Sequence, residues 1–452
     1  MNDPNGLVFY KNEYHLFYQH NPYGNTWGHM SWGHAVSRDL INWQHLPLAI
    51  PEYTDPQTGD STMVFSGTVV VDENNTSGLC LGSDCLIALY TSHIHRDQQG
   101  LRQHQSLAYS NDQGRTWTRY DKNPVLDIQR KDFRDPKVFW YEPSQKWVMV
   151  LVIPDLFKVR FYESKNLLSW NELSEFGPAG DTSRIWECPD LYSLPVANES
   201  GKSKWVLSLS GSHPAGPDFV GMQYFVGDFD GNHFTADTTT TAPRYVDYGK
   251  DFYAGITYNQ LPAQDDRTIM MGWVNNWAYG NFVPTRNWRS AMSVPRVLQL
   301  LKKGNEYHLI QQPVLELEKL RGEEVSVKGF HGGSFELVIQ WNGEDGTILE
   351  LFADETERTV IRKINGSIQL DRTTSGVTDF HKDFASADAV PVSAGEVELR
   401  VLVDQSIIEL YINQGESVIT SQVFPVNGNS IRTPEPEKIL SAKGWILRKV
   451  MN

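Results

Sequence analysis

The stretch DPNGLVFYKNEYHLFYQ (3–19) decides the fold, because its form returns four more times along the chain. It consists of an apolar strand, a polar turn and a second apolar strand. The related segments are FSGTVVV (65–71), FRDPKVFWYEPSQKWVMVLVIP (133–154), WECPDLYSLP (186–195) and DFYAGITYNQ (251–260). They follow one another at intervals of about 50 to 70 residues, and a strand-rich repeat of that size is typical of a β-propeller blade.

A second, outer repeat supports the blade interpretation. Apolar strands lead through a polar turn to a closing aromatic residue in HAVSRDLINW (34–43), LAYSNDQGRTW (107–117), FYESKNLLSW (161–170) and, more weakly, YFVGDFDGNHF (224–234). This pattern is typical of β-hairpins. Asp39 and Asp112 fall in the turns, where the expected role of the side chain is to cap the turn. With SVPRVLQLLKKGNEYHLIQ (293–311) closing the last unit, we predict a five-bladed β-propeller over residues 1–310.

The character of the sequence changes after residue 310. QPVLELEKLRGE (312–323) has a proline near its start and a glycine near its end, which predicts a short helix within a linker over residues 311–323. Seven short alternating strands follow: SFELVIQW, GTILELFAD, TVIRKI, SIQLDR, EVELRVLVD, SIIELYI and SVITSQVF. Strands of this kind, separated by polar turns, predict an antiparallel β-sandwich over residues 324–452. The predicted fold class is therefore all-β.

Composition excludes some classes of partner. The net charge is −15, which nucleic acid phosphates would repel, so we expect no nucleic acid partner. No apolar run approaches the roughly 20 residues of a membrane helix, so we expect no membrane partner. A neutral sugar is compatible with this charge. Aromatic residues make up 12% of the chain, and most of them are expected to fill space between blades.

The chain has three cysteines, which excludes a disulfide scaffold. Cys80 and Cys85 lie in one loop and predict either a small disulfide or two free thiols. Cys188 is left over beside Glu187. No signal peptide is visible in this numbering, yet we expect a secreted or periplasmic protein whose leader has been removed.

Three acidic residues each open an innermost strand of a predicted blade. Asp3 lies in NDPNG, Asp135 in RDP and Glu187 in WECPD. Taken alone, each is explained by a turn or a structural ion pair. Taken together they are not independent, because the innermost strands of a propeller surround one central pocket. Paired carboxylates at the mouth of a pocket indicate cleavage of a glycosidic bond.

The motifs MNDPNG, FSGT, RDP and WECPDL, in this order and at these separations, resemble glycoside hydrolase family 32. That family contains invertases, exo-inulinases, levanases and related fructosyltransferases. The resemblance covers essentially the whole chain, including VDQSIIELYINQGESVITSQVF near the end of the sandwich. One departure lies at the front, where the family motif usually carries a tryptophan before the methionine. We therefore expect Met1 to be an internal residue of a longer gene product.

The resemblance implies a role for each carboxylate. Asp3 is the nucleophile that attacks the anomeric C2 of a fructofuranosyl unit, Glu187 is the general acid and base, and Asp135 stabilises the transition state by holding fructose hydroxyls. A retaining enzyme of this type needs two carboxyls about 5–5.5 Å apart, one ionised and one protonated. We expect Asp3, beside backbone and amide donors, to be the ionised one. Trp186, Cys188 and other apolar neighbours are expected to favour the protonated form of Glu187.

The resemblance also implies a set of residues that hold the sugar. Amides of Asn2 and Gln19 bind hydroxyls, Trp27 walls the pocket, and the same subsite is lined by Phe65, Ser66 and Arg134. Contacts with the leaving sugar are expected from Asp247 and Lys250, and a wall from Trp273. For these last three a purely structural role is an equal alternative. His20, His29 and His34 lack a recognised metal-ligand spacing, so we expect no metal, and the mechanism needs no cofactor.

The main hypothesis is a retaining, exo-acting hydrolase that releases fructose from sucrose or from inulin or levan ends. A fructosyltransferase shares the first chemical step and is not distinguished by the sequence. An inactive fructan-binding protein is disfavoured because all three carboxylates are present. A five-bladed glycosidase for arabinan or xylan is disfavoured by the complete NDPNG and WECPDL motifs. The sandwich is expected to support the propeller or to form a homodimer rather than to bind carbohydrate.

Overall fold

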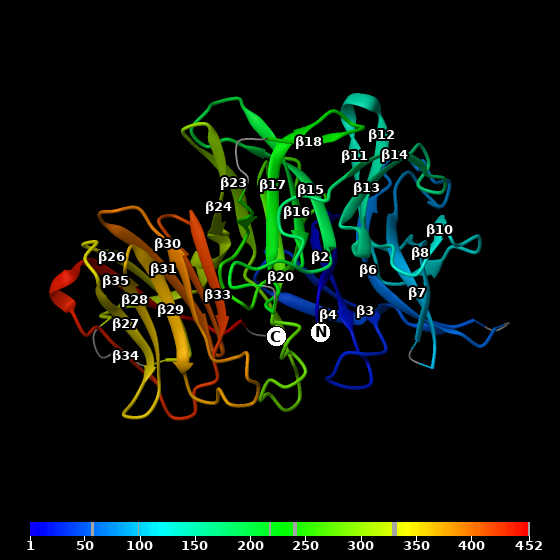
Figure 1. Ribbon diagram of the computed structural model, residues 1–452. Helices are drawn as coiled ribbons and strands as arrows, with labels where there is room; N and C mark the ends of the chain where they lie inside the picture. Colours follow the sequence, from blue (N-terminus) through cyan, green and yellow to red (C-terminus); the bar gives the residue numbers. More distant parts are fainter. Residues whose placement is uncertain (56–57, 98, 217, 238–241, 328–331, 451–452) are drawn as a thin grey trace.

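A computed structural model describes residues 1–55, 58–97, 99–216, 218–237, 242–327 and 332–450. Strands dominate it, and helices are limited, among the described residues, to short 3-10 turns. Five sheets follow one another along the chain, and two further sheets complete it. In Figure 1 the blue-to-green part forms the propeller, and the yellow-to-red part forms a separate layered body beside it. The all-β prediction is confirmed.

Each propeller sheet is antiparallel, and its main strands follow chain order outward from an innermost strand, while a few short strands pair off this path. The first blade is β1 (Pro4–Tyr10), β2 (Glu13–His20), β3 (Ser31–Ser37) and β4 (Trp43–Ile50). The second is β5 (Tyr53–Thr54), β6 (Ser61–Val71), β7 (Leu86–Arg96), β8 (Gln99–Ser110), β9 (Thr118–Arg119) and β10 (Leu126–Arg130). The third is β11 (Arg134–Tyr141), β12 (Lys146–Ile153), β13 (Lys158–Ser164) and β14 (Asn171–Phe176).

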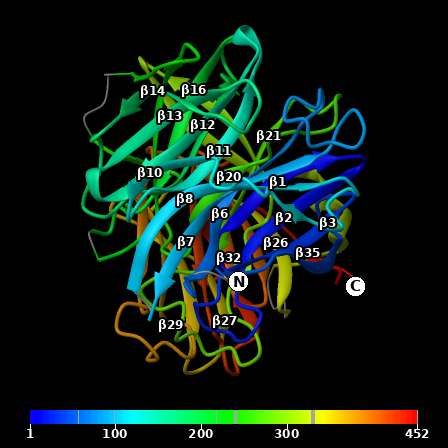
Figure 2. The same cartoon turned by 90° about the vertical axis from the view of Figure 1, so that its right-hand side faces the viewer.

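The last two blades carry short extra strands. The fourth is β15 (Glu187–Pro195), β16 (Ser203–Ser210), β17 (Met222–Phe229), β18 (Phe234–Ala236) and β19 (Arg244–Tyr245). The fifth is β20 (Tyr253–Thr257), β21 (Thr268–Val274), β22 (Ala291–Met292), β23 (Arg296–Lys303) and β24 (Glu306–Pro313). The innermost strands β1, β6, β11, β15 and β20 each pack on the next, and β20 packs back on β1. Figure 2 shows β1, β6, β11 and β20 side by side at the centre. The predicted five-bladed ring is therefore confirmed.

Residues 314–320 join the propeller to the second body. They contain the 3-10 helix η3 (Leu315–Leu320), which is short because Arg321 already turns back into an extended conformation. From there β25 (Arg321–Val325) enters a sheet with β26 (Ser334–Trp341), β31 (Val397–Asp404), β32 (Ile407–Ile412), β33 (Ser417–Gln422) and β35 (Ile439–Leu447). The short helix predicted in this linker is present, in the 3-10 form.

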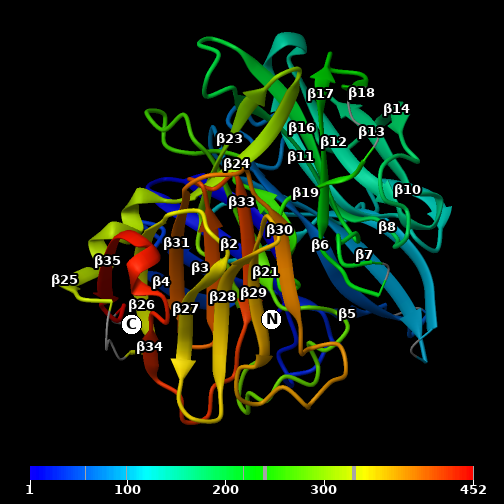
Figure 3. The same ribbon diagram turned by 60° about the vertical axis from the view of Figure 1, so that its left-hand side comes forward.

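A second sheet faces the first. It contains β27 (Gly346–Ala353), β28 (Arg358–Ile364), β29 (Ser367–Thr374), β30 (Ala387–Pro391) and β34 (Ser430–Arg432). Figure 3 shows β27 to β30 in front of the layer that holds β31 and β33. Alternate apolar side chains of both sheets form one core, as the period-2 pattern predicts. The predicted sandwich is confirmed, while positions 328–331 and 451–452 of its predicted range lie outside the described residues.

The two bodies meet along blade 5 and β33. The amide of Tyr248 donates to Val418, and that of Asp251 donates to Thr420. Gly249 lies between them, and a Cβ there would stand 2.0 Å from the Thr420 carbonyl oxygen. Glycine therefore lets two backbones approach closely across the interface. This contact fixes the segment that leads into β20 and, with it, one side of the central pocket.

Several smaller predictions are also settled. Cys80 and Cys85 form the disulfide rather than two free thiols. Asp39 and Asp112 cap their turns by accepting backbone amides, as expected. Large aromatic side chains such as Trp32 and Trp186 are fully buried between blades. Within the described ranges, no helix has the length and apolar character needed to cross a membrane.

Candidate active site

An open cavity of about 1320 Å³, mouth included, lies where the innermost strands begin. All three predicted carboxylates line it. So do most of the predicted sugar-binding residues, namely Asn2, Gln19, Trp27, Phe65, Ser66 and Arg134. The ring of blades therefore brings together side chains that are far apart in sequence.

Bulges aim these side chains into the cavity. The register of every innermost strand shifts near its start, for example between Arg134 and Lys137 in β11 and between Glu187 and Asp190 in β15. Asp135 (φ 62°), Cys188 (φ 45°) and Ala254 have left-handed backbone conformations at these bulges. A bulge bends the strand and re-aims a side chain, and such strained positions concentrate at functional sites.

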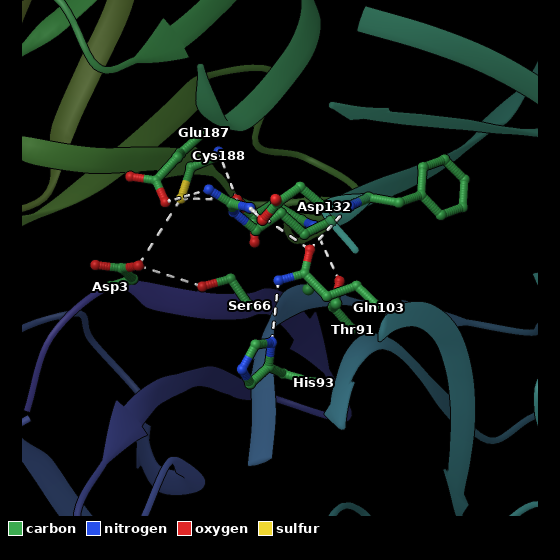
Figure 4. Close-up of polar contacts among 12 residues, drawn as sticks. Asp3, Ser66, Thr91, His93, Gln103, Asp132, Glu187 and Cys188 are labelled. Atoms are coloured by element: carbon green, nitrogen blue, oxygen red, sulfur yellow. Dashed lines mark hydrogen bonds and ion pairs between the residues drawn. The ribbon is translucent and has the colours of Figure 1, made fainter. Parts of the chain in front are cut away.

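Asp3 precedes β1 and lies at the floor of the cavity. Its Oδ2 accepts a hydrogen bond of 3.3 Å from the Ser66 hydroxyl, and the Cys188 sulfur lies 3.9 Å from the same oxygen. Its other oxygen, Oδ1, is buried and has no hydrogen-bond partner among the described residues. Figure 4 shows Asp3 and Glu187 on the same side of the cluster, with Cys188 near both. One oxygen of the Asp3 carboxylate is thus fixed by a hydrogen bond, and the other is available to react with a bound molecule.

Asp135 lies on the far side of the same sulfur. Its Oδ2 accepts the backbone amide of Cys188 at 3.0 Å, and the sulfur is 3.8 Å from that oxygen. The amide of Asp135 itself donates to the Thr91 hydroxyl at 3.0 Å. Burial and the neighbouring carboxylates raise the pKa of the Cys188 thiol well above its usual value. Cys188 is therefore a protonated neighbour of two carboxylates rather than a nucleophile.

Several acidic side chains lie close together in this cavity. Burial, and next the negative charges of Glu187 and Asp135, raise the pKa of Asp3 to about 7. Burial also raises the pKa of Asp135 to about 6, against the lowering effect of Arg134. The expectation that amide donors would keep Asp3 readily ionised was wrong. Desolvation and carboxylate repulsion outweigh those donors.

The surroundings of Glu187 also differ from the sequence-based expectation. Its carboxylate receives a hydrogen bond of 3.0 Å from Arg134 Nη2 and another from the Tyr253 hydroxyl. Trp186 is buried between blades 3 and 4, and Cys188 points toward the other carboxylates. Adjacent side chains of a strand point to opposite faces. The partners of the Glu187 carboxyl are therefore a guanidinium and a hydroxyl, so the predicted apolar surroundings were wrong.

Arg134 connects the carboxylates to a wall of the cavity. It is paired with Glu187, and its Nη1 donates to Asp132 at 3.0 Å. Gln103 accepts the Phe133 amide at 2.8 Å and lies 3.5 Å from Arg134 Nη1. Gln103 also bonds to His93 Nδ1 at 3.1 Å, and both are labelled in Figure 4. A fixed guanidinium among three acids supplies the main positive charge of the cavity.

Three predicted sugar-binding residues do not line this cavity. Asp247 is buried at the sandwich interface, where it accepts Arg296 at 2.9 Å and the Thr420 hydroxyl at 2.7 Å. Lys250 packs 3.5 Å over the Phe219 ring, near Asp388. These two residues point away from the cavity because the DYGKDFYA segment runs along the sandwich before it enters β20. Trp273 lies behind Trp277, with ring centroids 4.7 Å apart, and lines only an adjoining hollow.

Sequence reasoning missed ten lining residues, including Tyr253, His93, Gln103, Trp277 and Asn281. Tyr253 stands in the fifth repeat at the register position that Glu187 holds in the fourth, so a strict alignment of repeats would have found it. His93 and Gln103 come from the second and third strands of blade 2. Trp277 and Asn281 come from an irregular loop. These four carry no local signal, because only the packing of blades brings outer strands and loops to the mouth.

The histidines that raised the question of a metal do not converge. His34 bonds to His15 at 3.0 Å, and His29 bonds to Glu52 at 2.7 Å. His20 ends β2 and is half-buried. Across the described part of the chain, no group of three His, Cys, Asp or Glu side chains is placed to hold a metal ion.

Comparison with known proteins agrees with this geometry. A model of the glycosyl hydrolases family 32 N-terminal domain matches residues 1–313, and one of the family's C-terminal domain matches residues 298–436. A levanase from Bacillus subtilis is 44% identical over 94% of this chain, which spans 64% of that protein's length. The chain therefore covers somewhat less than two thirds of this relative.

Two solved structures share the whole fold. An exo-inulinase from Aspergillus awamori superimposes with a TM-score of 0.90 at 35% identity, covering 100% of this chain and 96% of that one. A fructofuranosidase from Schwanniomyces occidentalis, solved with fructosylnystose, gives 0.86 at 32% identity, covering 99% and 95%. The chain therefore belongs to glycosyl hydrolases family 32, and it is a glycoside hydrolase built from that family's N-terminal and C-terminal domains.

Proposed function

We propose that this protein is a retaining, exo-acting hydrolase that releases fructose from the non-reducing β-D-fructofuranosyl ends of sucrose and fructans. One observation carries the proposal. Three carboxylates from different blades, Asp3, Asp135 and Glu187, meet in one cavity beside the Arg134 guanidinium. Relatives named levanase, exo-inulinase and fructofuranosidase support fructosides as the substrate class.

In the first step, Asp3 Oδ1 attacks C2 of the fructosyl unit. The bond from C2 to the leaving oxygen breaks, and Glu187 gives its proton to that oxygen. Oδ1 suits this role because it has no other partner, while Ser66 fixes the second oxygen. Two carboxyl groups flanking the scissile bond are what a retaining glycosidase needs.

In the second step, water replaces the leaving sugar. Glu187 takes a proton from that water, whose oxygen attacks C2 and releases Asp3 as a carboxylate. Arg134 and the Tyr253 hydroxyl hold the Glu187 carboxyl in both steps. Asp135 is held by the Cys188 amide and is placed to bind fructose hydroxyls as positive charge develops at the ring.

The wall residues fit a single terminal sugar. Gln19 donates to the Val64 carbonyl at 3.0 Å, which fixes its amide in the cavity. Trp27 is 45% exposed, and its ring lies in a T-shaped arrangement with the Phe65 ring, with centroids 6.2 Å apart. Aromatic walls around fixed amides favour sugar binding. The cavity lies at one end of the ring of blades, which favours binding of the terminal sugar of a fructan chain.

Secretion is part of the proposal. The Cys80–Cys85 disulfide supports an oxidising compartment, and the exo-inulinase relatives are named as extracellular. A homodimer formed through the sandwich stays a prediction, which light scattering of the purified protein would test.

The decisive experiment follows the products from sucrose, inulin and levan. Free fructose from the first time point, with no short oligomers from the polymers, supports exo-hydrolysis. Initial release of the β-anomer, followed by NMR, supports retention. Growing oligomers would identify a transferase. Saturable fructan binding without turnover would overturn the proposal in favour of a binding protein.

A further inference from the structure

One loop of blade 5 lies between the cavity and the sandwich. It spans residues 275–290. On one side Trp277 and Asn281 line the cavity, and Asn281 accepts the amide of Trp27 at 3.0 Å. On the other side Tyr279 and Val283 are buried in a cluster with sandwich phenylalanines. The same short loop therefore forms a wall of the site and is packed by the second domain.

Tyr279 is the anchor of this loop. Its side chain is fully buried, and its hydroxyl donates to Asp251 Oδ1. The same hydroxyl accepts Arg372 Nη2 at 2.8 Å. Its ring meets the Phe384 ring edge-on at 5.4 Å. A buried hydroxyl satisfied on both sides has one orientation, so the backbone around Tyr279 is held in place.

Arg372 belongs to β29 of the sandwich and holds the anchor. Its Nε donates to the Phe384 carbonyl at 2.9 Å and its Nη1 to the Gln422 carbonyl at 3.0 Å. Nη1 also pairs with Asp251 Oδ2. The guanidinium is fully buried and is bonded on Nε and on both Nη atoms. Because the guanidinium is rigid and planar, it fixes the positions of Tyr279 and Asp251 relative to each other.

The path from this anchor to the acid is short. Two residues after Asp251, the Tyr253 hydroxyl donates to Glu187 Oε2. The Trp277 ring stands edge-on to Tyr253, with centroids 6.4 Å apart and planes at 87°. Asp251 thus lies two residues from Tyr253, which bonds to Glu187, and Tyr279 lies two residues from Trp277, which stands against Tyr253. Asp251 and Tyr279 are both held by one sandwich arginine.

We propose that Arg372 is a positioning residue for the cavity, acting through Tyr279 and Asp251 on the wall that Tyr253 and Trp277 build around Glu187. The inference rests on the proposed function, in which Glu187 protonates the leaving oxygen. It makes the sandwich part of the machinery that orients the acid. A small displacement of such a wall costs rate because proton transfer requires a narrow range of geometry.

Two matched tyrosine variants test this. Tyr279→Phe removes the hydroxyl that joins Arg372 to Asp251. Tyr411→Phe removes another buried hydroxyl of the interface, which donates to Glu409 at 2.8 Å, while the Tyr411 ring packs with Leu402 and Val418. Both should lower the melting temperature slightly. We expect Tyr279→Phe alone to lower kcat/KM for sucrose about 10- to 100-fold, with a smaller loss on a β-fructofuranoside whose leaving group needs no proton.

Equal losses in the two variants, or equal losses on the two substrates, would overturn the inference. If Tyr279→Phe does not fold, Phe380→Leu loosens the same anchor from the sandwich side, where the Phe380 and Tyr279 rings lie 6.4 Å apart. Fructose binding, followed by tryptophan fluorescence, should weaken in either variant and stay unchanged in Tyr411→Phe. Wild-type protein that releases no fructose would refute the proposed function instead, so the two failures are distinct.

Discussion

Aspartates are buried both in the cavity and at the sandwich interface, but the two places give them different numbers of hydrogen-bond partners. At the interface Asp251 meets a guanidinium, the Tyr279 hydroxyl and the Gln422 amide. In the cavity Asp3 has the Ser66 hydroxyl near one oxygen, and its other oxygen lacks a partner among the described residues. A buried carboxylate with a full set of partners helps to hold the fold together. A buried carboxylate with too few partners lowers stability but keeps an oxygen available to react.

The largest effect should come from the underpaired aspartate. Asp3→Asn keeps the shape of the side chain but cannot form the ester with C2, so we expect turnover to fall by about 10⁴-fold or more. Sucrose hydrolysis by purified protein measures this. A variant that keeps a tenth of the wild-type turnover would show that Asp3 is not the nucleophile.

Glu187→Gln should have the next largest effect on activity. A general acid typically contributes about 10²–10⁴-fold, and a good leaving group makes much of that unnecessary. We therefore expect a large loss on sucrose and a small one on an activated β-fructofuranoside, compared in parallel assays. Equal losses on both substrates would move the acid role to Asp135.

The paired aspartate should respond through stability. Asp251→Asn leaves Arg372 buried with too little negative charge, which we expect to cost about 3–5 kcal/mol of unfolding free energy. The matched control is Asp155→Asn at the exposed Arg130–Asp155 pair of 2.8 Å, where about 0–1 kcal/mol is expected. Chemical denaturation of both variants measures the difference. Equal values would remove the contrast between interface and surface.

The smallest expected effect is a stability gain with a defined pH dependence. The pKa of Asp3 is raised to about 7 in the folded protein, above the pKa of an ordinary carboxyl in the unfolded chain. Between these two pKa values, folding is accompanied by proton uptake at Asp3. Stability from this group is therefore lost as pH rises from about 4 to 7, by an amount of order 1–4 kcal/mol. Asp3→Asn should melt higher than wild type at pH 7 and at nearly the same temperature at pH 4. A constant difference between the two pH values would contradict the raised pKa.

Local sequence patterns predicted more of the sandwich than of the site. The segments SFELVIQW and GTILELFAD correspond to β26 and β27 almost residue for residue, because alternation directly specifies a half-buried strand. The four strands outside the predicted set, the short β25, β30 and β34 and the nine-residue β35, have weaker patterns. At the site, the motifs identified the residues that lie at strand starts, since these repeat along the chain.

By itself, the sequence determined the five repeated strands, the change to a sandwich, and the three acids that open Pro4–Tyr10, Arg134–Tyr141 and Glu187–Pro195. All of these depend on neighbours a few residues apart. Packing in three dimensions places Asp247 and Lys250 at the interface, sets Glu187 against Arg134 and Tyr253, and raises the pKa of Asp3 by burial. Those properties arise from charges and hydrogen bonds between residues 49 or more positions apart, because burial and electrostatic interaction depend on distance in space and not along the chain.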